Sequence, residues 1–243
     1  MVTILTAHQP LYMPWLGFFQ KVSMSDRFCL WDDVQFDPND FQHRNRLKNP
    51  NGTCIITVPI KSKGYREKTI RDMYIENQHN WKRVHWNTVS VSYSKSPYYD
   101  SYSDFFKKTF ETTWERLIDL DVHILEYLFK ELGMDVKIII ASQQEFKDTK
   151  SARIIDMCKK LNADVYIFGA MGKDYADLEL FKKEGIMPYF QSYNHPVYPQ
   201  LWGDFIPNLS VLDFLFNCGE KSYDILTSGN PTRDDIEKIH GDQ

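Results

Sequence analysis

The sequence predicts an α/β protein with a mostly parallel sheet flanked by helices and an aromatic-rich helical insertion. At both ends of the chain, short β-prone apolar runs alternate with helix-like stretches, as in doubly wound sheets. Between them, apolar and aromatic residues recur every three or four positions. In a chain of 243 residues, we expect a single α/β domain over residues 1–226, including a mainly helical insertion at about 70–132. The polar tail, residues 227–243, is expected to pack loosely or to be disordered.

The first 36 residues predict a strand, a helix and a second strand. Residues 2–7 are apolar and β-prone, and Pro10 ends this strand just after His8 and Gln9. Residues 15–25 place apolar side chains at helical spacing, and residues 27–36 again favour a strand. A parallel pair joined by a right-handed crossover is the usual outcome of this pattern.

The middle of the chain predicts a basic loop followed by helices. Residues 37–51 are polar and basic, and Asn51-Gly52 is typical of a hairpin turn. Residues 53–60 favour a strand and residues 69–75 can form another, whereas residues 81–94 and 102–132 have the spacing of amphipathic helices. Aromatic side chains within residues 81–114 suggest a homodimer face as one alternative, although such residues more often belong to the core.

The β-α-β pattern then returns. Residues 136–141 read as a buried strand, 151–161 as a helix and 164–168 as another strand. Residues 173–184 predict the next helix and residues 186–193 the last strand.

Composition and charge limit the classes of partner. Lys and Arg number 29 and Asp and Glu 33, for a formal net charge of -4, so we expect neither nucleic acid nor an acidic membrane as a partner. The N-terminus lacks the features of a signal peptide and no apolar run is long enough to span a bilayer, which predicts a cytoplasmic protein. The four cysteines form no C-x-x-C pair, so they are expected to be reduced and mostly buried.

His8 is the strongest candidate for a catalytic residue. Ligands of open α/β sheets bind beyond the carboxyl ends of the strands, where His8 and Gln9 are expected to lie. A helix N-terminus near Trp15 would favour a phosphate or carboxylate there, with Gly17 allowing a close approach. The alternative is that His8 only bonds a loop carbonyl.

Further candidates for substrate binding lie on predicted loops. Arg44, Asn45 and Arg46 offer donors suited to phosphate or carboxylate, although such a run can also be a solvated face. Ser142 follows a predicted strand and can bind a ligand or cap a helix. His195 lies in a proline- and aromatic-rich loop that can form the wall of a sugar site or be purely structural.

The segment Gly172-Lys173-Asp174-Tyr175 lies between a predicted strand and a predicted helix, as phosphate-binding turns do. Its spacing matches neither a P-loop nor a G-x-G-x-x-G fingerprint, and a tight turn that needs small residues is the alternative. No metal-ligand spacing, H-E-x-x-H motif or G-x-S-x-G elbow occurs, so we assign no metal and do not favour a serine hydrolase.

Several separated motifs occur in order between residues 3 and 220: His8-Gln9-Pro10-x-Tyr12-x-Pro14-Trp15-x-Gly17-Phe18-Phe19, Asp33-x-Gln35-Phe36, Arg44-Asn45-Arg46, Thr57-Val58-Pro59, Gly172-Lys173-Asp174-Tyr175, Tyr198-Pro199-Gln200 and Leu209-Ser210-x-Leu212-Asp213-x-Leu215-Phe216-Asn217-x-Gly219. Together they resemble the WbqC-like protein family. The resemblance implies a link to bacterial O-antigen and polysaccharide biosynthesis, and a glycine transferase that acylates a sugar amino group. It also implies Tyr12 as a substrate-binding residue.

A looser similarity concerns the start of the chain. The strand, the histidine-containing turn and the following helix resemble the nucleotidylyltransferase-type α/β fold, which includes pantothenate synthetase, an enzyme that joins a carboxylate to an amine through an acyl adenylate. The second histidine of that superfamily's H-x-G-H motif is missing here, and Trp15-Leu16-Gly17-Phe18 takes its place.

Three functional hypotheses follow. The first is a transferase that forms an amide on an amino sugar, preferably nucleotide-linked, with His8 as base or phosphate contact, Arg44, Arg46 and Lys173 for anions, and Gln9 and Asn45 for orientation. The second is an ATP-dependent, adenylate-forming ligase that acts on the same substrates. The third is a sugar-nucleotide binding protein without catalysis. The cofactor is not identified by the sequence, and ATP is one candidate.

Overall fold

The computed structural model describes residues 2–61 and 63–242. Its centre is a five-stranded sheet in the order β5-β2-β1-β6-β7, in which every neighbouring pair is parallel. The strands are β1 (Ile4–His8), β2 (Arg27–Leu30), β5 (Lys137–Ile140), β6 (Val165–Phe168) and β7 (Met187–Phe190). The predicted α/β class with a mostly parallel sheet is confirmed.

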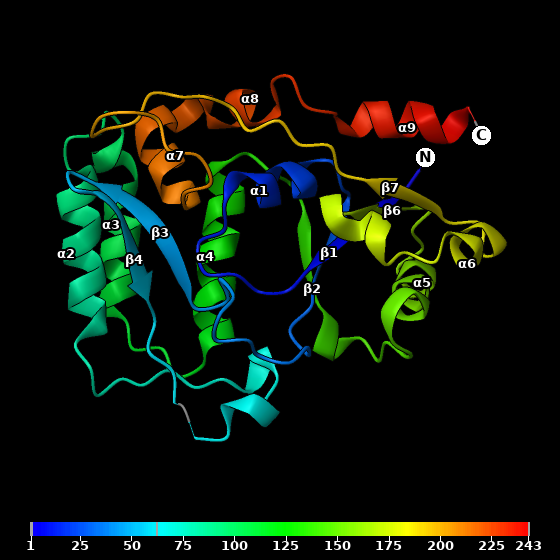
Figure 1. The fold of residues 1–243 in the computed structure, drawn as a ribbon, viewed down its shortest axis with the longest axis horizontal. Coiled ribbons are helices and arrows are strands. Elements are labelled where there is room, and N and C mark those ends of the chain that lie inside the picture. Colours follow the sequence, from blue (N-terminus) through cyan, green and yellow to red (C-terminus); the bar gives the residue numbers. More distant parts are fainter. Residues whose placement is uncertain (1, 62, 243) are drawn as a thin grey trace.

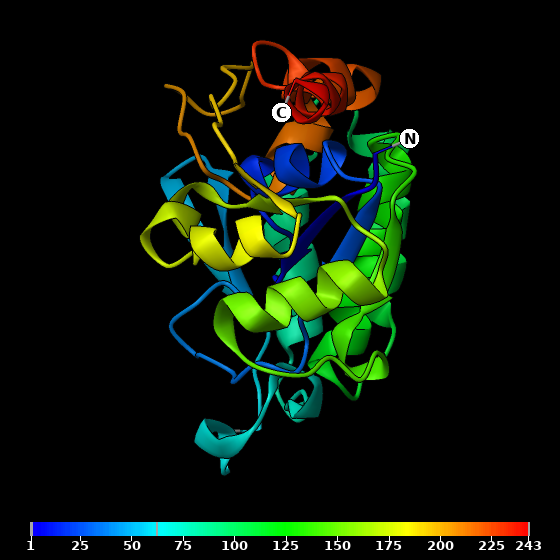
Figure 2. The same cartoon turned by 90° about the vertical axis from the view of Figure 1, so that its right-hand side faces the viewer.

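Helices cover both faces of this sheet (Figures 1 and 2). On one face, α1 (Leu16–Ser23) and α4 (Leu117–Glu131) pack through an aromatic cluster in which the Phe28 and Phe129 ring centroids are 5.8 Å apart. On the other face, α5 (Lys150–Lys160) and α6 (Leu178–Lys183) cover the second core, which contains Phe168 and Phe181. Two buried faces explain why the strands read as continuous apolar runs.

The predicted helical region lies beside the sheet and shares one core with it (Figure 1). It contains α2 (Trp81–Tyr93), α3 (Tyr99–Glu111) and α4, packed with α7 (Val211–Cys218) and an antiparallel hairpin of β3 (Arg44–Asn49) and β4 (Gly52–Thr57). Many of its aromatic side chains, such as Tyr93 and Phe106, are buried in the core.

Three local predictions in this region are wrong. Residues 44–49 form β3 instead of a loop, because each of them pairs with a residue of β4. Residues 70–72 form a short 3-10 helix instead of a strand. The expected helix over 102–132 is two helices, because the chain extends at residues 112–116 and Arg116 forms an isolated β-bridge with Tyr74.

The C-terminal tail is ordered, contrary to expectation. After α8 (Ser222–Thr227), residues 233–241 form α9 (Arg233–Gly241), whose N-terminus has a capping box between Thr232 and Asp235. Ile236 is fully buried against the sheet and Arg233 forms an ion pair with Asp26. A buried apolar residue, an ion pair and a helix cap therefore anchor the tail, and the domain boundary at residue 226 stays a prediction.

The strand order places a topological switch point between β1 and β6. Numbered along the chain, the five strands lie in the order 3-2-1-4-5 across the sheet, so the crossovers run in opposite directions on the two sides of β1. In the second half, residues 170–174 form a 3-10 helix and the expected helix over 173–184 begins only at Leu178. In the part of the chain that the structure describes, no helix has the length and apolar character needed to span a membrane.

Candidate functional site

A pocket of about 330 Å³ lies at the switch point, over the carboxyl ends of β1, β2 and β6. Of the sequence-predicted site residues, it brings together His8, Gln9 and Tyr175. The other residues that line it are Ala7, Lys21, Trp31, Val34, Tyr166, Phe168 and Gly169. Because ligands of open α/β sheets bind at this position, we take this cavity, called the switch-point pocket below, as the candidate active site.

His8 is held in one tautomer at the end of β1. Its Nδ1 lies 2.9 Å from the Gln9 carbonyl oxygen, and since a carbonyl only accepts, Nδ1 carries the proton and Nε2 the lone pair. Burial, with a further contribution from Lys21, lowers the pKa of His8 to about 3. The imidazole is therefore neutral at pH 7 and presents one hydrogen-bond acceptor.

Lys21 is the second ionisable group of the pocket and was not predicted as a site residue. It lies on α1, is only 4% exposed, and its Nζ donates a 2.9 Å hydrogen bond to the Ala7 carbonyl. Burial lowers the pKa of Lys21 to about 7. The sequence gives little sign of this role, because a lysine among apolar residues of a short helix usually faces water.

The Gln9 side chain joins the pocket to the loop that precedes β3. Its amide donates to Asp40 and its oxygen accepts a 3.1 Å hydrogen bond from Gln42. The Tyr12 backbone N–H also donates to the Phe41 carbonyl at 3.0 Å. These contacts fix the turn that follows β1, and with it the position of His8.

Trp31, which forms one wall of the pocket, is contacted by Arg153, and Arg153 in turn pairs with Asp33. Arg153 of α5 places its guanidinium 5.5 Å from the centre of the Trp31 ring and 2.5 Å from the Asp33 carboxylate. Both members of the ion pair are mostly buried. The sequence singled out Asp33 through the Asp33-x-Gln35-Phe36 motif. It gave no sign of Arg153, because the two residues are 120 positions apart and no local pattern links them.

Ser142 lies at the same edge of the sheet but in a neighbouring pocket of about 370 Å³. Its backbone N–H and its hydroxyl both donate to the buried carboxylate of Asp32, at 2.9 and 2.6 Å. The pocket also contains Arg71, Arg116 and the carboxylates of Asp119 and Glu126. Ser142 therefore organises the edge between β2 and β5, outside the switch-point pocket.

The Arg44-Asn45-Arg46 group serves the hairpin and lines none of the pockets described here. Arg44 donates to the Asn39 carbonyl, and Arg46 donates to the Asn208 carbonyl at 3.0 Å. Asn45 is buried and its amide donates to the carbonyls of Tyr12 (3.0 Å) and Met13 (2.7 Å). These contacts assign the three side chains to the architecture around the first turn.

Tyr12 and His195 also lie away from the switch-point pocket. Tyr12 is fully buried, and its hydroxyl donates to His85 Nδ1 at 3.0 Å. His195 donates from Nδ1 to the Pro196 carbonyl at 2.8 Å and accepts at Nε2 from the Asn208 N–H at 3.1 Å. Both nitrogens of His195 are thus used within its own loop.

The segment after β6 contributes two pocket residues, Gly169 and Tyr175. Tyr175 lines the switch-point pocket although 61% of its surface is exposed. Lys173 and Asp174 are exposed and absent from the lining, and the Lys173 ammonium lies 5.7 Å from the centre of the Phe190 ring. A Cβ at Gly172 would lie 2.4 Å from the Phe168 Cβ, so this turn needs glycine for packing.

The N-terminus of α1, where an anion was predicted near Trp15, is packed against aromatic side chains. The first residues of the helix are buried, and a Cβ at Gly17 would lie 3.1 Å from the Tyr193 ring. The close approach that Gly17 allows is therefore used by an aromatic side chain of the same protein.

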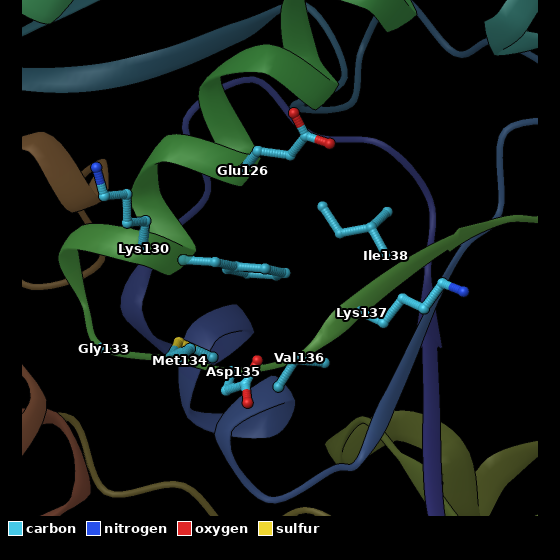
Figure 3. A pocket seen from close by; sticks show the side chains of 9 residues that line it. Glu126, Lys130, Gly133, Met134, Asp135, Val136, Lys137 and Ile138 are labelled. Atoms are coloured by element: carbon cyan, nitrogen blue, oxygen red, sulfur yellow. The ribbon is translucent and has the colours of Figure 1, made fainter.

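A larger pocket, of about 600 Å³, lies elsewhere, between α4 and the outer strand β5 (Figure 3). Figure 3 shows that the charged ends of Glu126 and Lys130 point away from one another. This open groove lacks a convergent set of polar groups, so it is a weaker candidate than the switch-point pocket. Among residues 2–61 and 63–242, no cluster of three His, Cys, Asp or Glu side chains has the geometry to hold a metal ion.

Comparison with known proteins agrees with the motifs. The model of the WbqC-like protein family matches residues 9–225. The uncharacterized protein Rv1507c of Mycobacterium tuberculosis is 30% identical over 220 residues, which cover 90% of this chain and 95% of that protein. No solved structure matches the chain significantly. The chain therefore belongs to the WbqC-like protein family.

Proposed function

We propose that the protein is an acyltransferase that forms an amide on an amino sugar, with a nucleotide-linked amino sugar as the acceptor and a glycyl or similar group as the acyl unit. The observation that carries this proposal is the arrangement of His8 in the switch-point pocket. Its Nδ1 is bound to the Gln9 carbonyl and its Nε2 is left as an acceptor.

Amide formation requires the attacking amine to lose a proton. The amine nitrogen bonds to the acyl carbon, the acyl carbon releases its leaving group, and the proton passes from nitrogen to a base. A neutral imidazole accepts a hydrogen bond from the amine and can take its proton in the transition state. Because the pKa of His8 is about 3, its main contribution is orientation of the amine together with transient proton transfer.

The size of the pocket supports one small unit of the substrate within it. Ligand sites usually measure about 300–1,000 Å³, and the switch-point pocket, at about 330 Å³, suits a single sugar ring or an acyl group. In this proposal the nucleotide part extends along the carboxyl edge of the sheet. The neighbouring pocket, which is lined by Asp32 and Ser142, lies on that edge and can receive the nucleotide part.

The second candidate is an ATP-dependent ligase that activates the acyl group as an adenylate. The strand order 3-2-1-4-5 favours it, because doubly wound sheets of this order commonly bind nucleotides at the switch point. This support is an analogy at the level of fold, whereas the His8 argument comes from the site itself.

The test is product formation detected by mass spectrometry. The protein is incubated with a nucleotide-linked amino sugar and either an acyl-CoA or glycine with ATP and magnesium. An acylated sugar formed from the acyl-CoA supports the transferase. Product that appears only with ATP, together with AMP and pyrophosphate, supports the ligase. Ligand binding without product under every donor condition would favour the non-catalytic alternative.

The matched variants are His8→Ala and His79→Ala. His8→Ala is expected to lower turnover by about 10²–10⁴-fold, the range typical of general acid–base groups, while the protein remains folded. His79 is exposed, so its variant should keep wild-type turnover. Equal turnover in both variants would remove His8 from the mechanism.

A further inference from the structure

We propose that Lys21 is the anion-binding residue of the switch-point pocket and that it receives a carboxylate or phosphoryl group of the ligand. The inference rests on the proposed function in placing the ligand in this pocket, but it does not depend on the reaction. It moves the anion contact from the predicted residues Arg44, Arg46 and Lys173 to a lysine of α1.

The first argument is the incomplete hydrogen bonding of a buried ammonium group. Lys21 is only 4% exposed and lines the pocket. An ammonium group has three N–H donors, and among the described residues only the Ala7 carbonyl accepts from Nζ, at 2.9 Å. Two donors therefore remain for a ligand, and burying them without acceptors is costly.

The second argument is the charge of the lining. Among the described residues that line the pocket, Lys21 is the only lysine or arginine and none has a carboxylate. The titratable side chains around it are His8 from β1, Tyr166 from β6 and Tyr175 from the segment after β6. Of the two carboxylates that follow β2, Asp32 accepts from Ser142 and Asp33 pairs through Oδ2 with Arg153. The pocket thus offers donors and one positive charge to an anion.

The arginines of the neighbouring pocket and of the β3–β4 hairpin differ from Lys21 in having partners within the protein. The neighbouring pocket mixes two arginines with three carboxylates, and its Arg116 is already paired with Asp119 at 2.7 Å. The guanidinium groups of Arg44 and Arg46 donate to backbone carbonyls. Of these cations, only Lys21 is buried and faces a pocket without an opposing acid.

A proton should accompany the anion. Burial lowers the pKa of Lys21 to about 7, so part of the free protein has a neutral amine at neutral pH. A bound anion favours the charged form and raises this pKa. If only the ammonium form binds, the apparent Kd rises about tenfold for each pH unit above about 7.

The experiment measures binding of sulfate and acetate by NMR titration of the full chain between pH 6 and pH 9. Neither probe changes its charge in this range, so the pH dependence belongs to the protein. Tighter binding of sulfate would identify the site with a phosphoryl group, and tighter binding of acetate would identify it with a carboxylate. We expect Kd to rise about tenfold per pH unit above about 7. A Kd that does not change with pH would overturn the proposal.

Three variants assign the effect. Lys21→Met should weaken anion binding by at least about tenfold, the factor that corresponds to a lost charge-assisted hydrogen bond of about 1.4 kcal/mol. Lys183→Met removes an exposed lysine and should leave Kd unchanged. His8→Gln should retain the pH dependence, because it leaves Lys21 in place. Wild-type affinity in Lys21→Met would refute the assignment.

A direct titration covers the case in which Lys21→Met does not fold. The lysine side-chain NMR signals of the wild-type protein should include one with a midpoint near pH 7 that moves upward when sulfate or acetate is added. A midpoint that stays in place at saturating anion would contradict the proposal. Anion binding without any acylated product would reject the proposed function alone, and product formation with no anion dependence would reject this inference alone.

Discussion

The Ser142 hydroxyl donates a 2.6 Å hydrogen bond to the Asp32 carboxylate, and the Ser142 backbone N–H donates a second one at 2.9 Å. Asp32 follows β2 and Ser142 follows β5, so this pair ties the carboxyl ends of two neighbouring strands across 110 residues of sequence. Asp32 is 2% exposed, so these donors take the place of water around its carboxyl group.

Ser142→Ala should destabilise the fold by about 1.5–3 kcal/mol, because it removes one hydrogen bond to a buried charged group. The free energy of unfolding from urea denaturation measures this loss. Ser101→Ala is the control, since Ser101 is exposed on α3, and it should change stability by less than about 0.5 kcal/mol. Equal stability of the two variants would show that Asp32 does not need the Ser142 hydroxyl.

Asn45→Ala should destabilise the protein by about 1–3 kcal/mol, because it leaves one buried carbonyl group without a donor and removes one of the two donors of a second. Those carbonyls belong to Tyr12 and Met13, and Met13 has a φ of 49°. Asn39→Ala changes an exposed residue and should be nearly neutral. If Asn45→Ala keeps full stability but abolishes substrate binding, Asn45 contacts substrate and the architectural role is wrong.

The stability of the protein should fall between pH 7 and pH 5 partly because of His85. Burial lowers the pKa of His85 from 6.5 to about 4, so between these values the unfolded chain binds a proton that the native protein does not. Stability from this source is present above pH 6.5 and is lost as the pH falls towards 4. At pH 5 the loss is roughly 2 kcal/mol.

His85→Gln removes this titration and should lose roughly 2 kcal/mol less than the wild type between pH 7 and pH 5. Urea denaturation at the two pH values gives the difference. His79→Gln, at an exposed position, should behave as the wild type. A pH dependence that is unchanged in His85→Gln would exclude His85 as its source.

Ile236→Ala should cost about 2–5 kcal/mol, because Ile236 is fully buried against β1, β6 and β7. Ile239 lies on the same helix and is 45% exposed, so Ile239→Ala should cost less than about 1 kcal/mol. Thermal denaturation of both variants checks the expectation. If both melt alike, α9 does not contribute to the folded core.

Sequence patterns predicted the parallel sheet well because buried strands leave a strong local signal. The same patterns placed His8 at the carboxyl end of β1, where the pocket lies. Local signals failed where long-range contacts decide the structure. Arg44 to Arg46 looked like a basic loop but belong to a strand, and α9 looked like a polar tail because Ile236 is the one buried residue within Arg233–Gly241.

The site was predictable only in part for the same reason. His8 and Gln9 follow directly from the position of a strand end. Lys21 does not, because its burial depends on the sheet and the segment after β6, which close around it. The Arg153 and Asp33 pair joins two segments that are 120 residues apart. Without an observed packing arrangement, such residues cannot be distinguished from surface charges.

The central claim is that the switch-point pocket binds the substrate, and NMR mapping of amide signals during addition of a nucleotide-linked amino sugar tests it most directly. The account predicts the largest shifts at Gln9, Trp31, Gly169 and Tyr175, which line the pocket. Shifts confined to the hairpin around Arg44 and the loop around His195, or no shifts at saturating sugar nucleotide, would contradict it.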